Sequence, residues 1–456
     1  METEFDKIAE EAGNAELAAW AAKVKAANED IVSFVGRKLK TNIPGGFVKY
    51  LQGSYNANLV IRFGEEDIVI IRFPKRGITA AKFLEEKVKN EVRFLEYLAE
   101  KTAIPVPKIR DWGTAKECPS QLSPYIIMDY IEGTELSALL QQLQDDHKEA
   151  EIDLVYEQIA DYMLQISRMH FSAIGPINKD TSGAWTVTDR PLTTNMNNLA
   201  SVVTDYPVDQ FPKVAFTSAQ AFLHYHTEEN LVHLQVQRNL AHSRQDAERC
   251  LIARHKFKQL IERFHPPSEA DNGPFIPYCH DFRPKNMLAR YEEGSLKIVA
   301  VLDFEYVNTM PAQFAYDPPW WLAMVSPGLM LEKFAMEDFE DLYVPRLEQF
   351  LRAMAKAEAK KNVSHGREAF SLTSRMRDSW TSKRFWFNYG IRKSWSVDVV
   401  YWSALHEPGD EKLSGDLEKE MSLIAEKKMS LIAEKKMEQL AAYEAECDAR
   451  GIAQSG

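Results

Sequence analysis

A short polar loop and hairpin inside a helical half of the chain constrain this sequence more than any other feature. Beyond Gly133 the chain is predicted to be mostly helical, because long stretches contain neither Gly nor Pro (154–170, 219–238 and 246–264). The run from Pro277 to Asn308 breaks this pattern. A loop carries Asp281 and Asn286, a β-prone segment follows at 296–302, and Asp303 comes directly after it. We therefore expect the chemistry of this chain to be concentrated around one short hairpin.

The N-terminal part of the sequence predicts a small sheet with one helix. Residues 47–73 are β-prone and are broken at Gly53 and at the polar turn 64–67, which predicts three consecutive antiparallel strands. Apolar residues recur at helical spacing from Ala80 to Glu100. The segment from Pro124 to Ile131 is typical of a further strand that runs into a connector.

The length of the chain predicts two lobes, since 456 residues exceed the roughly 250 to 300 at which one hydrophobic core stops growing. We expect an α+β fold with four regions: an N-terminal helical extension (1–44), an N-lobe with an antiparallel sheet (45–132), a larger, mainly helical C-lobe (133–345) and a C-terminal helical extension (346–456). The last region contains the octapeptide MSLIAEKK twice in tandem, at 421–436. Because a period of eight fits neither a heptad nor a common helical repeat, we interpret it as a duplicated surface helix without a catalytic role.

Composition and charge exclude several classes of protein. With 55 Lys and Arg against 67 Asp and Glu, the formal net charge of −12 disfavours binding to nucleic acid or to anionic membranes. The four cysteines form no C-x-x-C pair, and no window of about 18 apolar residues could cross a membrane. The first 29 residues indicate an amphipathic helix rather than a signal peptide. We therefore expect a cytoplasmic protein with no nucleic-acid or membrane partner, and the sequence leaves the oligomeric state open.

The loop and hairpin contain the residue types that phosphoryl transfer requires. That reaction needs a carboxylate to orient the attacking hydroxyl, oxygen ligands for Mg²⁺ and cations on the phosphates. Asp281 precedes Asn286 by five positions, and Asp303 follows seventeen positions later, as in the D-x-x-x-x-N loop and metal-binding Asp of kinases. A capped loop whose polar side chains only bond their own backbone is the alternative. Arg283 inside the loop would contact a phosphate or a substrate anion, or pair with a nearby acid.

Flanking segments extend this match along the chain. They are NGPF at 272–275, DPPWWL at 317–322, QRN at 237–239, IAR at 252–254, GSYN at 53–56 and IRFP at 71–74. Together with the loop they resemble the fungal branch of the aminoglycoside phosphotransferase-like family. The resemblance covers residues 45 to 330 and implies a bilobal protein-kinase-like fold.

The resemblance also implies roles for individual residues. Asp281 would be the catalytic carboxylate that positions or deprotonates the acceptor hydroxyl, while Asn286 and Asp303 would hold Mg²⁺ on the phosphates of ATP. Arg72 takes the position where kinases have a phosphate-binding Lys, and Glu91 on the following helix would pair with it. An ordinary salt bridge between a strand and a helix is the alternative for Arg72.

Further nucleotide contacts are implied in the N-lobe. Gly53 and Ser54 would cover the phosphates, although this turn has one glycine where protein kinases have three, and a plain hairpin turn is the alternative. Met128 and Tyr130 would belong to the hinge whose backbone binds adenine.

The implied activity is transfer of the γ-phosphate of ATP, with Mg²⁺, to a hydroxyl of a small molecule. Two alternatives stay open: a pseudokinase or nucleotide-binding interaction protein, and a kinase-like fold reused for another ATP- or tRNA-dependent transfer. The sequence does not specify the acceptor.

Other conspicuous side chains receive structural interpretations. His224, His226 and His233 fall on one predicted helix, and we interpret them as exposed residues rather than a metal site. Trp320 and Trp321 follow a Pro-Pro pair, and we interpret them as core anchors for the helix that follows.

Overall fold

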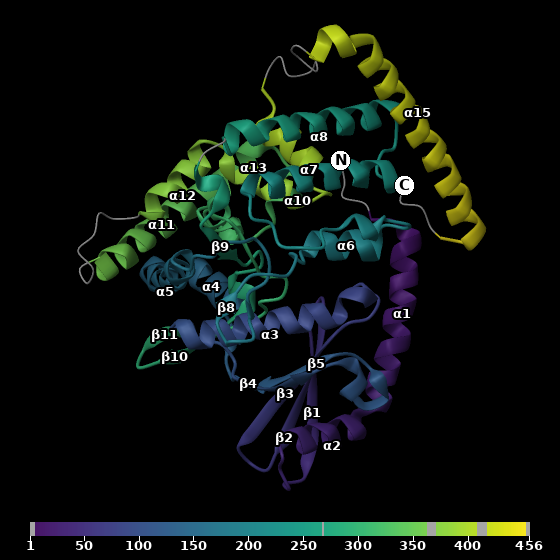
Figure 1. Ribbon diagram of the computed structural model, residues 1–456. Helices are drawn as coiled ribbons and strands as arrows, with labels where there is room; N and C mark the ends of the chain where they lie inside the picture. Colours follow the sequence, from purple (N-terminus) through teal and green to yellow (C-terminus); the bar gives the residue numbers. More distant parts are fainter. Residues whose placement is uncertain (1–4, 267–268, 363–370, 408–416, 453–456) are drawn as a thin grey trace.

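The chain forms two lobes, seen one above the other in Figure 1. The computed structural model describes residues 5–266, 269–362, 371–407 and 417–452. A small lobe built on an antiparallel sheet lies at the bottom of this view, and a larger, mainly helical lobe lies above it. The expected bilobal α+β fold of the protein-kinase type is confirmed.

Five antiparallel strands form the N-lobe sheet in the order β1–β2–β3–β5–β4. Their bounds are β1 (Gly45–Gln52), β2 (Asn56–Phe63), β3 (Asp67–Pro74), β4 (Ile109–Gly113) and β5 (Tyr125–Asp129). β1, β2 and β3 confirm the three predicted consecutive strands. Because side chains alternate along a strand, β3 turns Ile71 and Phe73 to one face of the sheet and Ile70 and Arg72 to the other.

Helices cover both faces of this sheet. α1 (Lys7–Ala26) and α2 (Asn28–Lys38) lie on the face that carries Ile71, where Trp20 and Phe34 join the same apolar cluster. α3 (Leu84–Lys101) lies on the opposite face, where Val88 and Val92 pack against β5. The face that carries Arg72 therefore also carries α3, which contains Glu91.

α1 reaches from the N-lobe sheet to the helical lobe. It passes so close to the loop after β3 that a Cβ on Gly13 would lie 2.6 Å from the Gly77 carbonyl oxygen, so glycine is needed for this approach. At its other end Ile8 packs with Tyr443, Cys447 and Ile452 near the C-terminus. α1 therefore contacts both lobes, as its length in Figure 1 indicates.

The C-lobe contains most of the helices. Those before the hairpin are α4 (Leu136–Asp145), α5 (Glu149–Ser167), α6 (Thr194–Val202), α7 (Ala219–Val236) and α8 (Arg244–Phe264). Those after it are α9 (Ala312–Ala315), α10 (Pro327–Lys333), α11 (Met336–Asn362), α12 (Leu372–Thr381), α13 (Arg384–Ile391), α14 (Val397–Val400) and α15 (Leu417–Arg450). The predicted helical stretches at 154–170, 219–238 and 246–264 correspond to α5, α7 and α8.

Short strands around the predicted hairpin interrupt this helical lobe. β10 (Met287–Glu292) and β11 (Ser295–Val301) form the hairpin, and β6 (Thr134–Glu135) adds a third strand. β9 (Phe275–Tyr278) pairs with β12 (Asn308–Pro311) on either side of it. A small pair, β7 (Asn178–Lys179) and β8 (Trp185–Thr186), lies apart. The loop with Asp281 thus connects β9 to β10, and Asp303 lies between β11 and β12.

The expected boundary at 345/346 falls inside a continuous helix, since α11 contains Pro345. The helices beyond it belong to the main core of the C-lobe, because Phe350, Phe387 and Tyr401 share one apolar cluster with Phe304 beside the hairpin. This part of the chain therefore supports the hairpin directly.

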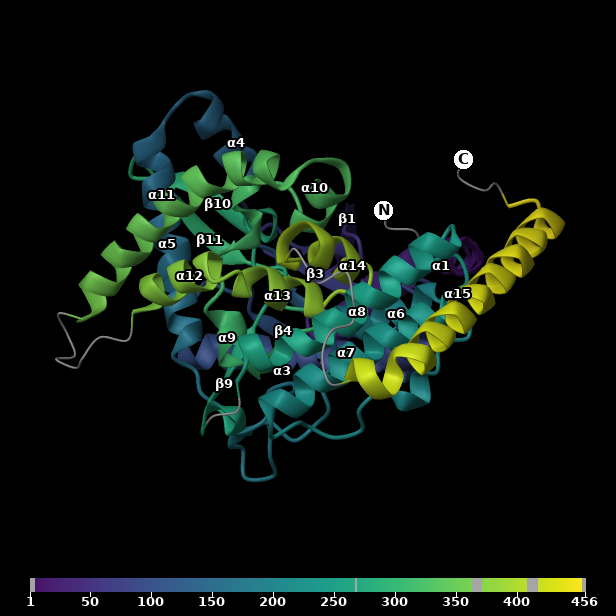
Figure 2. The same cartoon turned by 90° about the horizontal axis from the view of Figure 1, so that it is seen from above.

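The octapeptide repeat lies in α15, which runs along the outside of α8 (Figure 2). The structure describes its side chains from Met429 onward, so only those of the second copy can be placed. Ala433 and Lys436 are buried there, whereas Leu431 is exposed. Because eight residues rotate a helix by about 80° beyond two turns, two successive copies present different faces. The helical interpretation is confirmed, and one face of the second copy is packed against the C-lobe.

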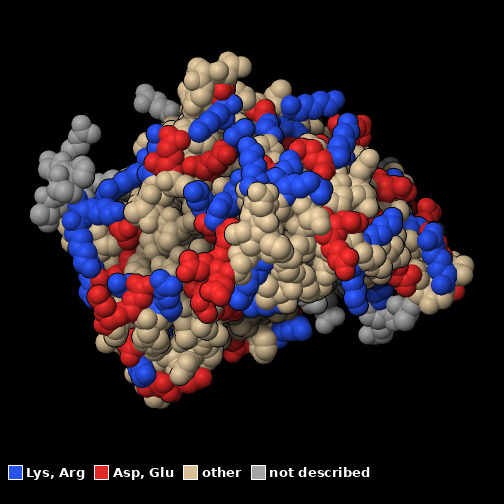
Figure 3. Space-filling view, turned by 90° about the horizontal axis from the view of Figure 1, so that it is seen from below, with Lys and Arg blue, Asp and Glu red and all other residues tan. Residues whose placement is uncertain are grey.

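Charged side chains of both signs are interspersed over the face seen from below, without a continuous basic surface among the described residues in that view (Figure 3). No helix in the described parts of the chain is long and apolar enough to cross a membrane.

Candidate functional site

The loop between β9 and β10, which carries Asp281, is held in shape by Asn286, which lies in a single 3₁₀ turn, Pro284–Asn286, before β10. Its Nδ2 donates to the Asp281 backbone oxygen at 3.0 Å and to Asp281 Oδ2 at 2.7 Å. The Leu302 amide donates to the Asn286 carbonyl oxygen at 2.8 Å, which brings the end of β11 against the loop. Local bonding of the kind proposed by the capped-loop alternative is therefore present. It leaves Asn286 Oδ1 as the amide oxygen that could bind a metal.

Asp303 is the second residue beyond this hairpin and has a left-handed backbone conformation, with φ of 65°. Asp is one of the few residues other than Gly that adopts this region readily. The conformation turns the side chain toward the N-lobe, where Asp303 Oδ1 accepts a hydrogen bond from Arg72 Nη2 at 3.0 Å. Backbone strain of this kind is common at functional sites.

Arg72 joins three acceptors from three different elements. Its Nη1 donates to Glu91 on α3, Nη2 donates to Asp303, and Nε donates to Asn58 Oδ1 on β2 at 3.2 Å. Burial lowers the pKa of Arg72, but the charges of Glu91, Asp303 and Glu305 outweigh it and hold that pKa above its usual value. The structure thus brings together Arg72, Glu91 and Asp303, at a position that is 12% exposed for the Arg72 side chain rather than on the open surface.

A second cation at the lobe junction was not predicted from the sequence. Lys87 on α3 is 1% exposed and its Nζ lies 2.6 Å from Glu305 Oε2, two residues after Asp303. Asn56 Nδ2 donates to the same carboxylate oxygen at 2.9 Å, and its Oδ1 accepts from Lys87 at 2.7 Å. Burial raises the pKa of Glu305 to about 7, against the attraction of Lys87. The spacing of Lys87 four residues before Glu91 was the available signal, because it places both on one face of α3.

Arg283 pairs with Asp281 within the loop. Its Nε lies 2.7 Å from Asp281 Oδ1, and its Nη2 donates to Oδ2 at 3.2 Å. The two side chains are 33% and 25% exposed, so the carboxylate remains accessible. Of the two readings of Arg283, the structure shows the pair with a nearby acid.

Two indole rings form hydrogen bonds with the main chain of the loop that carries Asp281. Trp320 Nε1 donates to the His280 carbonyl oxygen at 3.0 Å, and Trp321 Nε1 donates to the Phe282 carbonyl oxygen at 2.8 Å. Trp321 is 3% exposed and packs in the main core, as expected for an anchor. The two tryptophans therefore anchor the main chain on both sides of Asp281.

The predicted nucleotide-contacting residues of the N-lobe lie at the edges of this cluster. Gly53 and Ser54 are exposed in the turn between β1 and β2, and the Gly53 carbonyl oxygen accepts from Lys75 Nζ at 2.6 Å. The Met128 side chain is buried under α3, and the Tyr130 amide donates to the Ile68 carbonyl oxygen at 3.1 Å. Their contacts to a nucleotide stay predictions.

Two of the three histidines on α7 are buried, so their interpretation as exposed residues is wrong. His226 and His233 are 1% and 0% exposed. Both belong to hydrogen-bond networks: His226 Nδ1 lies 3.1 Å from Glu229 Oε2, and His233 Nε2 lies 2.7 Å from Gln237 Oε1. α7 is enclosed by neighbouring segments on several sides, so it lacks the single polar face that the interpretation assumed.

The donor set at the hairpin fits a magnesium ion held jointly with phosphates. Within the described residues, no three His, Cys, Asp or Glu side chains gather into a group that could hold a metal ion. Asp303 and Asn286 offer one carboxylate and one amide oxygen, and Mg²⁺ is usually bound by one or two such ligands together with substrate phosphates and water. These residues therefore suit Mg²⁺ brought by a nucleotide better than a resident metal.

The two-lobe fold, the loop and the hairpin define a kinase-like phosphotransferase fold. A sequence model of the phosphotransferase enzyme family matches residues 53–358, and the chain belongs to that family.

Comparisons with individual proteins give more distant matches. Altered inheritance of mitochondria protein 9, mitochondrial, from Scheffersomyces stipitis is 29% identical over 111 residues, which are 24% of this chain and 17% of that protein. The chain therefore spans about a sixth of the length of this curated relative. The GDP complex of aminoglycoside 2′-phosphotransferase-IIIa is 12% identical, with a TM-score of 0.40 and coverage of 90% of this chain and 97% of that one. Macrolide 2′-phosphotransferase MphH from Brachybacterium faecium is 13% identical, with a TM-score of 0.34 and coverage of 83% and 99%.

The expected cytoplasmic location is contradicted by these comparisons. The relative from Scheffersomyces stipitis is named as a mitochondrial protein, and matching proteins from three other species carry the same name.

Proposed function

We propose that this protein is an ATP- and Mg²⁺-dependent phosphotransferase that moves the γ-phosphate of ATP to a hydroxyl of a small molecule. The observation that carries the proposal is one continuous set of contacts across the lobe junction. Glu91 and Asp303 both bind Arg72, while Asn286 binds Asp281 beside them. Membership of the phosphotransferase family agrees with this assignment.

Each partner of the reaction has a suitable group in this set. Asp303 and Asn286 would hold Mg²⁺, which neutralises charge on the phosphates when bound. The Arg72 guanidinium would contact phosphate oxygens, for which its planar fork of donors is suited. Glu91 fixes the direction of that guanidinium from α3.

Asp281 would receive the proton of the acceptor hydroxyl. In the transfer, the acceptor oxygen forms a bond to the γ-phosphorus, the bond from that phosphorus to the bridging oxygen of ADP breaks, and the hydroxyl proton passes to Asp281. Trp320 and Trp321 hold the main chain on both sides of this carboxylate, so it keeps its position while the acceptor binds. When the acceptor hydroxyl binds, Arg283 would either release the Asp281 carboxylate or share its oxygens with that hydroxyl.

Asp281→Asn tests the proposal, because an amide keeps the shape of the side chain but cannot take up the proton. We expect turnover to fall by about 10²- to 10⁴-fold while Mg-ATP binding changes little. Turnover is measured as ADP release and as a mass gain of one phosphate in metabolite extracts, with Asp303→Ala as the blank. Asp209→Asn, an exposed position, is the matched control.

Two outcomes would speak against the proposal. Turnover that is unchanged in Asp281→Asn would exclude the role of this residue. Binding of Mg-ATP without transfer to any acceptor in a broad panel would favour a nucleotide-binding interaction protein instead.

We further propose a mitochondrial location, because the matching relatives are named as mitochondrial proteins. Fractionation of cells that express the full-length protein is the direct check, and recovery only outside mitochondria would contradict it.

A further inference from the structure

A cavity of about 250 Å³ lies beside the catalytic loop. Its wall includes His280, the neighbour of Asp281, and Tyr55 from the turn before β2. The Tyr55 hydroxyl donates to Asn198 Oδ1 on α6 at 3.4 Å, so this turn closes the cavity against the C-lobe. The cavity is therefore placed where the molecule that receives the phosphate would bind, and its volume is just below the roughly 300 Å³ at which the usual range of ligand pockets begins.

The charged residues of the cavity wall are Arg392 and Lys393, just after α13. No carboxylate is among the described residues that line it. The carboxylate nearest Arg392 is Asp317, which lies 4.0 Å from Arg392 Nη2 and also accepts bonds from Ser379 and Asn388. Lys393 Nζ contacts the Tyr389 hydroxyl at 3.1 Å and forms no ion pair within the described part of the chain. The wall therefore has an excess of positive charge.

The acids of the neighbouring site do not cancel this charge. Asp281 is paired with Arg283, Asp303 shares Arg72 with Glu91, and none of these three acids lines the cavity. A ligand that enters the cavity therefore meets two cations whose charge is at most partly balanced.

His226 provides a second and independent sign of a ligand. This side chain is 1% exposed and lines the cavity, and its Nε2 has no hydrogen-bond partner. Its Nδ1 faces Glu229, which also accepts bonds from Asn195 at 2.6 Å and Tyr225 at 2.8 Å. The remaining ring nitrogen, Nε2, can form a hydrogen bond with a ligand hydroxyl, which is both a donor and an acceptor. A buried polar atom without a partner costs free energy that a bound ligand would recover.

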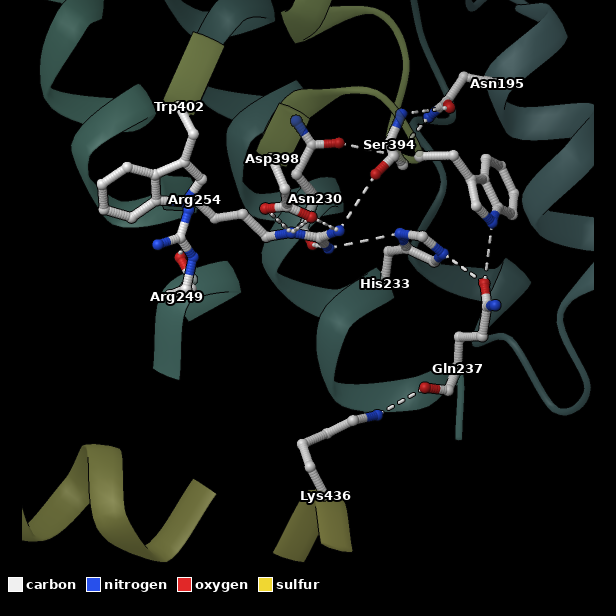
Figure 4. Close-up of polar contacts among 11 residues, drawn as sticks. Asn195, Asn230, His233, Gln237, Arg249, Arg254, Ser394, Asp398, Trp402 and Lys436 are labelled. Carbon is white, nitrogen blue, oxygen red and sulfur yellow. Dashed lines mark hydrogen bonds and ion pairs between the residues drawn. The ribbon is translucent and has the colours of Figure 1, made fainter. Parts of the chain in front are cut away.

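The segment that carries the two cations is fixed by a buried network (Figure 4). Arg254 forms an ion pair with Asp398 and donates from Nη2 to the Ser394 carbonyl oxygen at 3.1 Å. The Ser394 hydroxyl donates to Asn230 Oδ1 at 2.7 Å, and its amide donates to Asn195 Oδ1 at 3.0 Å. The side chains converge on Ser394 from the surrounding helices, as Figure 4 shows. Arg392 and Lys393 are thus presented by a rigid part of the C-lobe.

Aromatic side chains also line the cavity, and such residues can bind cationic ligands. Here the Arg392 guanidinium already lies over the Tyr278 ring, 4.3 Å from its centroid. A cationic ligand would therefore meet two like charges at the position where it would have to bind, which argues for a ligand of the opposite sign.

We propose that this cavity binds an anionic small molecule with free hydroxyl groups, and that this molecule is the phosphate acceptor. Its carboxylate or phosphate group binds Arg392 and Lys393, and a hydroxyl forms a hydrogen bond with His226 Nε2. The assignment of the ligand as acceptor rests on the proposed phosphotransferase function, whereas the binding site does not.

Binding is tested first, on the Asp281→Asn protein, so that its result does not depend on turnover. The probes are ribose 5-phosphate and gluconate as anionic hydroxyl compounds, ribose as their neutral counterpart, and kanamycin and choline as cations. We expect calorimetry to detect only the anionic probes. Arg392→Gln and Lys393→Gln should each weaken that binding by roughly ten- to hundredfold, because each removes a charge-assisted contact.

Charge-matched controls separate this effect from loss of folding. Arg352→Gln and Lys213→Gln remove exposed cations elsewhere and should leave binding unchanged. Arg392→Lys and Lys393→Arg keep the charge and should retain most of the binding. His226→Phe should weaken the binding of hydroxyl-bearing anions more than that of inorganic phosphate.

Turnover of the wild-type protein with the same probes then tests the assignment as acceptor. Transfer to anionic probes, with a raised KM and a retained kcat in Arg392→Gln, supports the whole proposal. Equal or better binding of ribose, kanamycin or choline overturns the anionic site. Anion binding that is unchanged in Arg392→Gln and Lys393→Gln overturns it as well. Anion binding without transfer to any probe overturns the acceptor assignment but leaves the site, and it counts against the proposed function.

Discussion

Arg72 illustrates how one side chain can organise a site that joins two lobes. Its guanidinium donates to Glu91, Asp303 and Asn58 through three different nitrogen atoms. A lysine at this position has one compact ammonium group on a flexible stem, which cannot reproduce this planar fork. Arg72, which replaces the usual kinase lysine, therefore has three hydrogen-bond acceptors that suit a guanidinium group.

Arg72→Lys should weaken Mg-ATP binding by roughly ten- to hundredfold, because one or two charge-assisted hydrogen bonds are lost, each worth about 1.5 to 3 kcal/mol. Calorimetric titration with a non-hydrolysable ATP analogue measures the change. Arg62→Lys is the matched control, since Arg62 is exposed on the neighbouring strand. If Arg72→Lys and the control bind Mg-ATP with the same affinity, the planar guanidinium of Arg72 has no role in nucleotide binding.

The residues that could be predicted from the sequence are those whose spacing itself carries information. Asp281, Asn286 and Asp303 are separated by a loop and a hairpin of fixed length, so their proximity follows from local structure. The pair Lys87–Glu305 joins two lobes and depends on how they dock, which no local pattern specifies. The burial of His226 likewise depends on what packs around α7, and not on α7 alone.

Among the elements, α15 is fastened to the C-lobe by a buried lysine. Lys436 Nζ donates to the Gln237 carbonyl oxygen at 2.5 Å, and Lys436 is 1% exposed (Figure 4). Burial, together with the nearby charge of Arg254, lowers the pKa of Lys436 to about 7. The unfolded chain keeps the ordinary lysine pKa, so above pH 7 it binds a proton that the folded protein does not.

The free energy of unfolding should therefore rise with pH between about 7 and 10, by up to roughly 1.4 kcal/mol per pH unit from this group. Lys436→Met should lack this contribution. Urea unfolding at pH 7 and pH 9 checks it, as the difference in unfolding free energy between wild type and variant. Lys435→Met, one residue earlier and exposed, is the control. If the difference in unfolding free energy between wild type and Lys436→Met does not increase from pH 7 to pH 9, Lys436 is charged in the folded protein.

The long helices and the three N-terminal strands could be predicted because their patterns extend over many residues. The strands β9 and β12 have only four residues each and lie among helices, so periodicity does not reveal them. The boundary expected at 345/346 fails to coincide with an element end because α11 continues through Pro345. Burial of Leu347 and Phe350 in the next turns offsets the cost of a proline inside a helix.

At the scale of the whole molecule, two contacts join the lobes: Arg72 with Asp303, which is partly buried, and Lys87 and Asn56 with Glu305. The second contact should depend on pH. Burial raises the pKa of Glu305 to about 7, so the folded protein keeps a proton on this carboxyl group that the unfolded chain loses near its ordinary pKa of 4.5.

The free energy of unfolding should consequently fall as pH rises from about 4.5 to 7, by up to about 3 kcal/mol from this group. Glu305→Gln removes the titration and resembles the protonated carboxyl group, so the unfolding free energy of the wild type relative to that of the variant should be lower at pH 8 than at pH 5, by up to about 3 kcal/mol. Chemical unfolding at both pH values gives the two differences, and Glu293→Gln on the exposed hairpin turn is the control. A difference that is constant with pH would mean that Glu305 is ionised throughout.

The position of α1 has a consequence for how nucleotide could enter and leave. Because this helix approaches the N-lobe closely at Gly13 and packs on the C-terminal helix at Ile8, it links the two lobes. Its first turn is also held to the C-lobe, since α1 contacts α6 and the Thr204 amide donates to Asp6 Oδ2 at 3.2 Å. A rotation of the lobes about the segment after β5 would have to break the contacts of this first turn or the one at Gly13. The rate of nucleotide exchange would then be set at the far end of the molecule, by the attachment of the first turn of α1 rather than by the groups that bind phosphate.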